Sequence, residues 1–354
     1  MLNWHLLSHV SRAGEWFLRS GIQEPTGGVA RYYRADLGRN QRVSTEITGY
    51  AASTLVYLHA LTGDRRYLDR AVSTARFLAA TAWDAAACVL PFELDPANLT
   101  YFFDCGIVIR GLTAVWRASG ITEFLAVAAL LGETMSRDFA AVAGEFHPIL
   151  TLPEKKPLPR DPLRWSQAPG CYQLKSGLAW WDLAEALDDA SFRQPYEDLR
   201  RAAMTNAPAF LPGHPEPAKV MDRLHAYLYF LEGLLPRADD AECAAAIRTG
   251  IDRVAGYLRD IAPQFERSDV YAQLLRVRIY AAGFVELDRR AAAEEAARLA
   301  EFQSASADPR LDGGFYFGRA NGAMLPHVNP VSTGFALQAL ALWNGAGAFR
   351  HLLI

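Results

Sequence analysis

The sequence lacks three features that would place it in a specialised class of protein. Its four cysteines lie far apart with no C-x-x-C pair, which favours buried thiols over a disulfide framework or a zinc knot. Its 36 basic and 39 acidic side chains form no block of one sign, so we expect no nucleic-acid or membrane partner. No window offers about eighteen uncharged apolar residues, and the start shows no cleavable leader. These absences predict a cytoplasmic protein.

The composition supplies a large core. Hydrophobic residues make up 51% of the chain and charged residues 21%, the balance of a globular protein. At 354 residues the chain is long for one compact core, yet no linker divides it. We therefore expect residues 1–354 to form a single domain with a closed, repetitive architecture.

Helical segments alternate between two kinds along the whole chain. One kind has an apolar stripe and a charged face. These amphipathic segments are residues 4–20, 66–81, 123–139, 194–207, 241–261 and 289–303. The other kind is apolar nearly all round, and these segments are residues 47–63, 105–120, 174–187, 223–235, 270–284 and 332–345. A helix that is apolar all round must be covered on every side, so the second kind is predicted to lie inside.

Closing the repeat into a ring covers the inner helices best. Equivalent points along the inner segments recur at intervals of 44 to 70 residues, with no convincing strand between them. The predicted fold is therefore all-α: an (α/α)6 barrel, or toroid, of about twelve helices in six hairpins. An open solenoid of helix pairs is the alternative, although solenoid repeats usually keep a tighter period.

Two segments carry a resemblance to known proteins. EITGYAASTLVYLHALTGDRRYLDRA (46–71) and VSTGFALQALALW (331–343) resemble hairpins of the six-hairpin toroid proteins that act on carbohydrates. These include unsaturated glucuronyl hydrolases, N-acylglucosamine 2-epimerases and uronyl-epimerase domains. Lys175 and Ser176 depart from the Arg-Gly-Gln-x-Trp helix of the glucuronyl hydrolases. The resemblance implies the toroid fold and a carbohydrate-active enzyme.

Polar and aromatic residues gather just before or at the start of each inner segment, where free N–H groups and helix dipoles attract polar ligands. The predicted catalytic residues are Asp104, Asp222, His225, Asp269 and Tyr271. The predicted substrate-binding residues are Glu46, Tyr50, Tyr172, Lys175, Gln273, Phe315, Tyr316, Arg319, His327 and Asn329. Carboxylates would transfer protons, and aromatic rings would stack on a sugar. For each Asp or Asn, a helix N-cap is the structural alternative.

Three of these positions carry more specific hypotheses. Asp104 follows three aromatic residues, which would raise its pKa as a general acid requires. Asp222 and His225 are three residues apart, so on a helix they share a face and suit a base with its orienting carboxylate. A zinc site of Asp104, Cys105 and a distant histidine stays open, although no ligand spacing supports it.

Two loops are expected at the mouth of the ring. In DGGFYFGRANGAMLPHVNP (312–330), glycines permit a tight turn, and the aromatics either stack on a substrate or plug the mouth. The same DGGFYFG stretch resembles a motif of terpene cyclases and prenyltransferase β-subunits, but the acidic pairs of this chain sit in ordinary turns. The proline-rich stretch 147–172 is either a rim over the opening or an extended connection.

Taken together, these residues favour a glycoside hydrolase that acts on an acidic, uronic-acid-containing oligosaccharide or polysaccharide by general acid–base catalysis. Lys175, Arg319 and His327 would bind the anionic group. A sugar or uronyl epimerase, a polysaccharide lyase and a non-catalytic toroid that binds a glycan or a protein are the alternatives. We expect no cofactor and no metal, and the sequence does not predict the oligomeric state.

Overall fold

The computed structural model describes residues 4–161 and 164–354, and in this part of the chain helices dominate. The outer helices are α1 (Trp4–Arg19), α3 (Arg65–Arg76), α5 (Thr122–Asp138), α7 (Arg193–Phe210), α9 (Ala241–Ile261) and α11 (Arg289–Ala300). The inner helices are α2 (Thr45–Thr62), α4 (Phe102–Ser119), α6 (Leu174–Leu187), α8 (Pro217–Leu234), α10 (Ser268–Tyr280) and α12 (Pro330–Trp343). Outer and inner helices alternate along the chain, as the sequence predicted.

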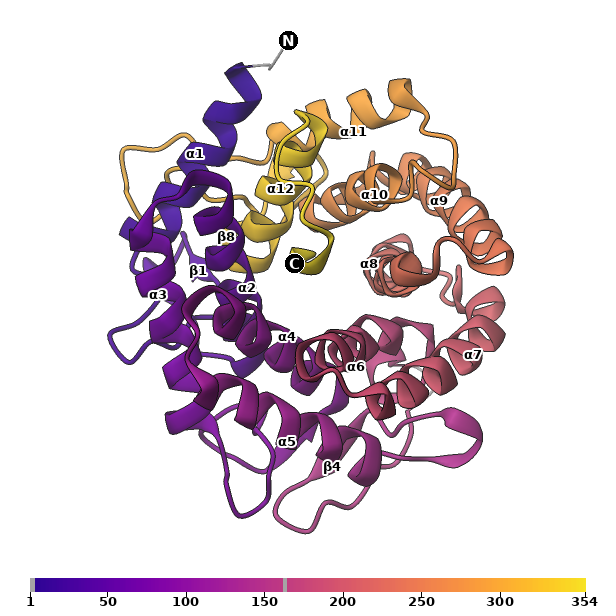
Figure 1. Ribbon diagram of the computed structural model, residues 1–354. Coiled ribbons are helices and arrows are strands. Elements are labelled where there is room, and N and C mark those ends of the chain that lie inside the picture. Colours follow the sequence, from indigo (N-terminus) through magenta and orange to yellow (C-terminus); the bar gives the residue numbers. More distant parts are fainter. Residues whose placement is uncertain (1–3, 162–163) are drawn as a thin grey trace.

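The inner helices close into a ring (Figure 1). Each packs against the next, from α2 through α12, and α12 packs against α2 to complete the circle. The outer helices form a second layer, in which α1 covers α12 and the other outer helices cover the inner helices that precede them in the chain. The predicted (α/α)6 barrel is therefore confirmed, and the open solenoid is excluded because the first and last inner helices are in contact.

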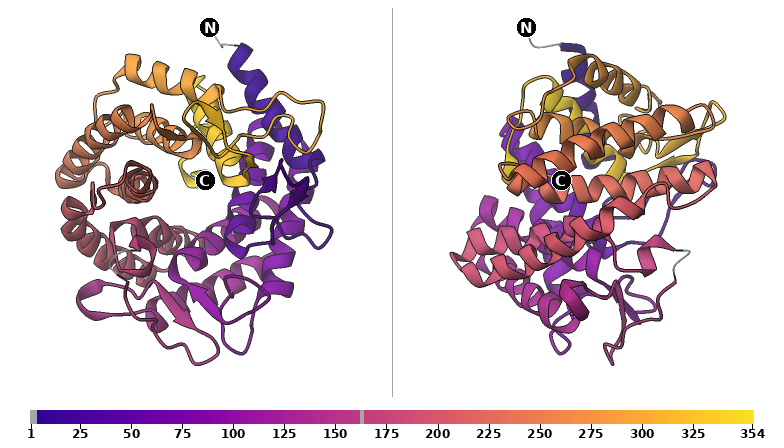
Figure 2. Two further views of the ribbon diagram at one scale, coloured as in Figure 1. Left: turned by 180° about the vertical axis from the view of Figure 1, so that it is seen from behind. Right: turned by 90° about the vertical axis from the view of Figure 1, so that its right-hand side faces the viewer.

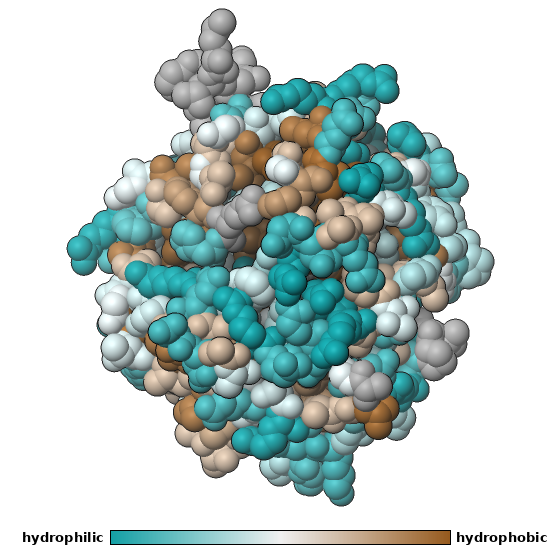
Figure 3. All heavy atoms as spheres, turned by 45° about the vertical axis from the view of Figure 1, so that its right-hand side comes forward, coloured by the Kyte–Doolittle hydropathy of each residue, from teal (hydrophilic) through white to brown (hydrophobic). Residues whose placement is uncertain are grey.

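Burial separates the two kinds of helix. In α12 every residue from Pro330 to Leu342 is buried, whereas α3 buries only Tyr67, Ala71, Thr74 and Ala75. The face shown in Figure 3 is mostly hydrophilic, with hydrophobic residues gathered toward its upper part. None of the helices in the described residues combines the length and the apolar composition needed to cross a bilayer.

Short strands, which the sequence did not predict, form a rim at one end of the ring. The strands are β1 (Tyr33–Arg34), β2 (Arg39–Asn40), β3 (Leu99–Tyr101), β4 (Ile149–Thr151), β5 (Phe265–Arg267), β6 (Gly318–Ala320), β7 (Ala323–Met324) and β8 (His327–Val328). They pair into three small antiparallel sheets in the orders β2-β1-β8, β3-β4 and β5-β6-β7. Because β3, β5 and β8 lead directly into α4, α10 and α12, this rim lies at the N-terminal ends of the inner helices. Figure 2 shows the ring from behind and from the side.

A cluster of buried charges fills the middle of the ring. Glu232 of α8 accepts hydrogen bonds from Lys175 of α6, at 2.9 Å, and from Arg276 of α10, and all three side chains are fully buried. Burial alone would raise the pKa of Glu232, but the two cations outweigh it and lower that pKa. The last residues turn back into the ring, where the backbone oxygen of Ile354 accepts from Lys175 and Arg276. This cluster therefore lies buried inside the ring.

Candidate functional site

A cavity of about 390 Å³ opens at the N-terminal ends of the inner helices. It is lined by Glu46, Phe92, Tyr101, Phe103, Asp104, Pro148, Trp165, Ser166, Tyr172, Asp222, His225, Tyr229 and Arg267. Its volume falls in the range typical of small-molecule sites. Pro148, Trp165 and Ser166 come from the proline-rich stretch 147–172, which therefore forms part of the rim; residues 162–163 lie outside the described residues.

Two carboxyl groups face this cavity from neighbouring helices. Glu46 is in the first turn of α2 and Asp104 in the first turn of α4. The helices approach closely because glycines meet where they cross: a Cβ atom on Gly111 would lie 2.6 Å from the carbonyl oxygen of Gly49. Close packing of α2 on α4 therefore brings the two carboxyl groups into one cavity.

The environment raises the pKa of both carboxyl groups. Burial, and then the charge of Glu46, raise the pKa of Asp104 well above its ordinary value, and Arg31 opposes the shift. Burial also raises the pKa of Glu46 to about 7. Asp104 is 7% exposed, and its Oδ2 has no hydrogen-bond partner among the described residues. The raised pKa that the preceding aromatics predicted for Asp104 is present, and Asp104 does not cap α4, whose N-cap is Tyr101.

Aromatic rings form the walls. Phe92 and Tyr101 lie with ring centroids 4.5 Å apart, and Phe103 lies 4.7 Å from Tyr229. Tyr172 contacts Trp165 edge-on at 4.9 Å. Flat apolar faces beside carboxyl groups are the combination that a pyranose ring requires, because its C–H face is apolar and its hydroxyl groups are polar.

His225 of α8 lines the same cavity as a neutral imidazole. Burial lowers its pKa to about 4, despite the nearby charge of Asp269. Its Nδ1 lies 2.7 Å from Oε1 of Gln273, whose Nε2 donates to Glu232. Since the amide oxygen of Gln273 can only accept, this arrangement assigns the proton to Nδ1 and leaves Nε2 unprotonated. His225 is therefore held in the tautomer that can take up a proton at Nε2.

Arg267 organises the carboxylates on the far side of the cavity. It donates two hydrogen bonds to Asp269, at 2.9 and 2.6 Å, and one to Asp222 at 2.8 Å. Burial would raise the pKa of Asp269, but Arg267 outweighs it and lowers that pKa. Asp269 is thus an ionised partner of Arg267, which does not suit the acid–base role predicted for it. The orienting carboxylate predicted for His225 is also corrected: Asp222 binds Arg267, and Asp269 lies 3.5 Å from Nδ1 of His225.

The structure brings five of the predicted site residues to the cavity and places the others elsewhere. The five are Glu46, Asp104, Tyr172, Asp222 and His225. Tyr50, Lys175 and Gln273 are buried in the core instead. Lys175 was expected to bind a substrate anion, but its pairing with Glu232 removes it from the cavity.

Two further predicted residues gather around a buried glutamate on another side of the ring. Arg319 donates to Glu266 at 2.7 and 3.0 Å, and the hydroxyl of Tyr271 lies 3.4 Å from the same carboxylate. Arg298 completes the cluster. Tyr271 therefore does not line the carboxylate cavity, and Arg319 is engaged by acidic side chains.

The loop before α12 supports the helix more than it lines the cavity. Phe315 is fully buried in the core, and Asn329 caps α12 by accepting from the backbone N–H of Val331 at 2.7 Å. Tyr316 is half-buried beside the core. His327 packs against Tyr32, with ring centroids 4.9 Å apart, in the rim sheet. Phe315 is thus a core residue, and the capping alternative describes Asn329.

Eight of the cavity residues were absent from the predicted set, and four of them, Tyr229, Trp165, Arg267 and Phe92, show what the sequence could and could not reveal. Tyr229 lies one helical turn beyond His225, so their shared face was available from spacing alone. Trp165 belongs to the expected rim loop. Arg267 directly precedes an inner helix, which is the position where site residues were expected. Phe92 has no feature in the sequence that would identify it as a cavity residue.

The chain offers no cluster of metal ligands in its described part. No three His, Cys, Asp or Glu side chains gather there closely enough to hold a metal ion. The four cysteines are unpaired; Cys105, Cys171 and Cys243 are buried, and Cys88 is partly exposed. The Asp104–Cys105–histidine zinc site has no support, and burial raises the pKa of the Cys105 thiol to about 12.

Comparison with known proteins gives likeness in structure alone. No protein-family model and no curated protein matches the sequence. A sugar epimerase from a ruminal bacterium superposes with a TM-score of 0.73 at 13% identity, covering 96% of this chain and 98% of that one. Cellobiose 2-epimerase from Spirochaeta thermophila superposes with a TM-score of 0.70 at 15% identity, covering 96% of this chain and 97% of that one. An inactive variant of the α-1,6-mannanase of Salegentibacter sp. superposes with a TM-score of 0.60 at 10% identity, covering 95% of this chain and 98% of that one. Over nearly its whole length, the chain therefore has the toroid fold of these carbohydrate-active enzymes.

Proposed function

We propose that this protein is a glycoside hydrolase in which Asp104 and Glu46 are the general acid and the general base. One observation carries the proposal: two carboxyl groups from adjacent inner helices share a buried, aromatic-walled cavity, and both have raised pKa values. Two carboxyl groups held at different pKa values are the residue set of glycosidic bond hydrolysis.

The roles follow from the environments. Asp104, whose pKa is raised well above its ordinary value by burial and whose Oδ2 has no hydrogen-bond partner among the described residues, keeps its proton and donates it to the glycosidic oxygen as the C–O bond breaks. Glu46, with a pKa of about 7, is the group of the pair that ionises first, and it takes a proton from the water that attacks the anomeric carbon. Phe103, Tyr172 and Trp165 stack on the sugar and exclude bulk water.

The charges around the cavity favour an uncharged sugar over a uronic acid. Lys175, Arg319 and His327 were the residues expected to bind an anionic group, and none of them lines the cavity. Arg267 lines it but is already engaged by two aspartates. We therefore propose a neutral oligosaccharide and keep acidic oligosaccharides as the comparison set.

The test is an activity screen with matched variants. Neutral and uronic-acid oligosaccharides are incubated with the full chain, and products are resolved by chromatography. Asp104→Asn and Glu46→Gln should each lower kcat by about 10²–10⁴-fold, the usual contribution of a positioned acid or base. The control Asp222→Asn alters a carboxylate of the same cavity that Arg267 holds, and it should change kcat less than tenfold. Equal kcat in wild-type protein and in either Asp104→Asn or Glu46→Gln would refute the assignment.

A second candidate, sugar epimerisation, rests on His225. Its unprotonated Nε2 could remove a proton from a carbon atom next to a carbonyl group, and sugar epimerases share this fold. Reaction in D₂O separates the two candidates. Epimerisation places deuterium on a sugar carbon without shortening the chain, whereas hydrolysis in H₂¹⁸O places ¹⁸O on the new reducing end and leaves the C–H bonds intact.

A further inference from the structure

A second cavity lies at the opposite end of the ring, where the inner helices end. It has a volume of about 330 Å³. Its lining residues are Arg110, Leu178, Trp181, Asp182, Glu185, Leu235, Pro236, Tyr280, His351 and Leu353, none of which lines the carboxylate cavity. The buried cluster of Lys175, Glu232 and Arg276 lies inside the ring and is absent from both linings.

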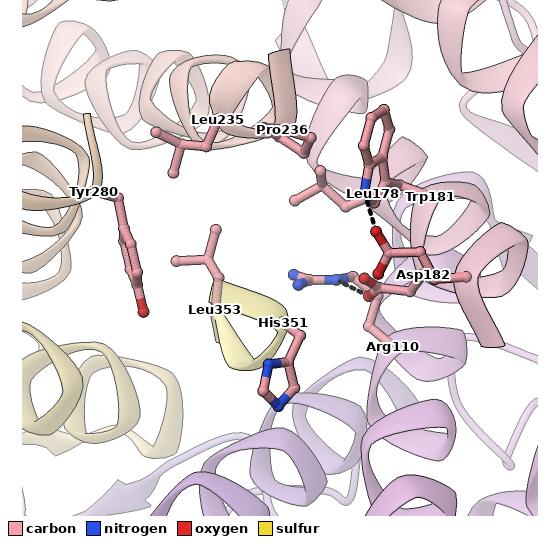
Figure 4. Close-up of a pocket in the computed structure, with 10 residues that line it drawn as sticks. Arg110, Leu178, Trp181, Asp182, Leu235, Pro236, Tyr280, His351 and Leu353 are labelled. Carbon is pink, nitrogen blue, oxygen red and sulfur yellow. Dashed lines mark hydrogen bonds and ion pairs between the residues drawn. The ribbon is translucent and has the colours of Figure 1, made fainter. Parts of the chain in front are cut away.

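The polar centre of this second cavity is Arg110. The residue is 7% exposed, and its Nε donates to Oδ2 of Asp182 at 2.9 Å. Among the described residues, its two terminal nitrogens have no hydrogen-bond partner in the protein, and they point away from Asp182 into the middle of the cavity (Figure 4). A buried guanidinium with unpaired donors favours a ligand that brings acceptors, and its fork geometry suits a carboxylate or a phosphate.

The acidic residues nearby do not cancel this preference. Asp182 is engaged by Arg110, and its backbone oxygen accepts from Arg117 at 3.3 Å. Glu185 lies 3.7 Å from Arg117 and 3.5 Å from Arg193. Counting Arg117 and Arg193, which lie beside the cavity but do not line it, three guanidinium groups pair with two carboxylates, so the acidic groups are outnumbered by one. The basic groups also offset the negative ends of the helix dipoles at this mouth.

The remaining walls are apolar and aromatic. Leu178 lies beside Trp181 on the side of Asp182, Leu235 and Leu353 lie farther across the cavity, and the ring of Tyr280 stands at its far side (Figure 4). One side of the cavity thus presents charge, and the other presents apolar surface. Such a lining selects a small molecule with an anionic group on an apolar body.

We propose that this second cavity binds a small carboxylate or phosphate that carries an apolar or aromatic group, with the anion on the terminal nitrogens of Arg110. The proposal is independent of the hydrolase assignment, because it concerns the other end of the ring and a different set of residues.

Benzoate is the probe, and benzamide is its uncharged counterpart of the same shape. Both are titrated into the full-length chain by isothermal titration calorimetry. Benzoate should bind at least about tenfold more tightly than benzamide, since hydrogen bonds to a charged group typically exceed the free energy of a tenfold change. Equal binding of the two, or no binding of benzoate, would overturn the proposal.

Matched double variants locate the site. Arg110→Gln with Asp182→Asn removes a buried ion pair as a unit, and it should weaken benzoate binding by about tenfold or more while leaving benzamide unchanged. Arg278→Gln with Glu295→Gln removes another buried pair, 2.9 Å apart between α10 and α11, and should bind benzoate like wild type. If both double variants bind it equally well, Arg110 is not the anion ligand.

Two further variants complete the design. If the first double variant fails to fold, Leu235→Trp fills the cavity and keeps Arg110, and it should abolish benzoate binding. Glu46→Gln changes the carboxylate cavity alone, so it should leave benzoate affinity unchanged whether or not the protein is a hydrolase. A change in benzoate affinity in Glu46→Gln, including the tighter binding expected when a nearby negative charge is removed, would place benzoate in the carboxylate cavity and refute the second site.

Discussion

Replacing Glu46 with glutamine should make the protein more stable as well as much less active. In the folded protein the pKa of Glu46 is raised from 4.5 to about 7, so ionising it in place is unfavourable. At 1.36 kcal/mol per pKa unit the shift corresponds to at most about 3 kcal/mol, and its coupling to Asp104 makes this an upper value. Because the folded pKa is raised, Glu46 costs the wild-type protein stability as pH rises from about 4.5 to 7, and Glu46→Gln lacks this contribution.

Urea unfolding at pH 4, 6 and 8 measures the effect. The two proteins should have similar free energies of unfolding at pH 4, and the variant should be more stable by up to about 3 kcal/mol at pH 8. Glu154→Gln, at an exposed position, is the matched control and should show no pH-dependent gain. A stability difference that is absent at pH 8, or that is the same at all three pH values, would contradict the burial argument for Glu46.

Three other substitutions test separate parts of the structure. Arg267→Gln leaves the buried carboxylate of Asp269 without its cation, so the free energy of unfolding should fall by about 3–5 kcal/mol in denaturant titrations. A fall of less than about 1 kcal/mol would show that the pair is not buried as described. Gly313→Ala should destabilise the fold by about 1–3 kcal/mol, because Gly313 has φ of 87° and a Cβ atom there would lie 2.2 Å from the backbone oxygen of Arg12; an unchanged melting temperature would refute this contact. Trp165→Ala should raise KM for the sugar roughly 2- to 12-fold, the equivalent of about 0.5–1.5 kcal/mol of stacking, with stability unchanged; a fall in kcat alone would assign Trp165 a different role.

The carboxylate cavity was predictable in part. Asp104 was predicted because it follows Tyr101, Phe102 and Phe103 at the start of an apolar segment. In the structure it lies in the first turn of the buried helix α4. Glu46 was expected only to bind substrate, because spacing along one helix gives no information about a carboxyl group on the next. Its pairing with Asp104 depends on the close approach of α2 to α4, where Gly49 meets Gly111.

The ion-pair partners of the buried lysine and arginine residues could not be predicted from the sequence pattern. Lys175 looked like a substrate ligand because it lies near the start of an inner helix, yet it bonds to Glu232, 57 residues later in the chain. Arg319 likewise bonds to Glu266, 53 residues earlier. Charge partners on different helices cannot be paired from a single sequence, since many acidic residues lie at comparable separations.

The sequence by itself determined the order and kind of the helices and the ring that they form. An apolar residue pattern on all sides forces a helix inward, and six such helices with six amphipathic partners bury one another only when the circle closes. The tertiary structure alone decided which polar residues face the cavity. A helical period fixes which side chains share a face, but the rotation of each helix in the ring is set by packing against its neighbours. That rotation places Glu46, Asp104 and His225 in one cavity and buries Lys175 and Gln273 beneath it.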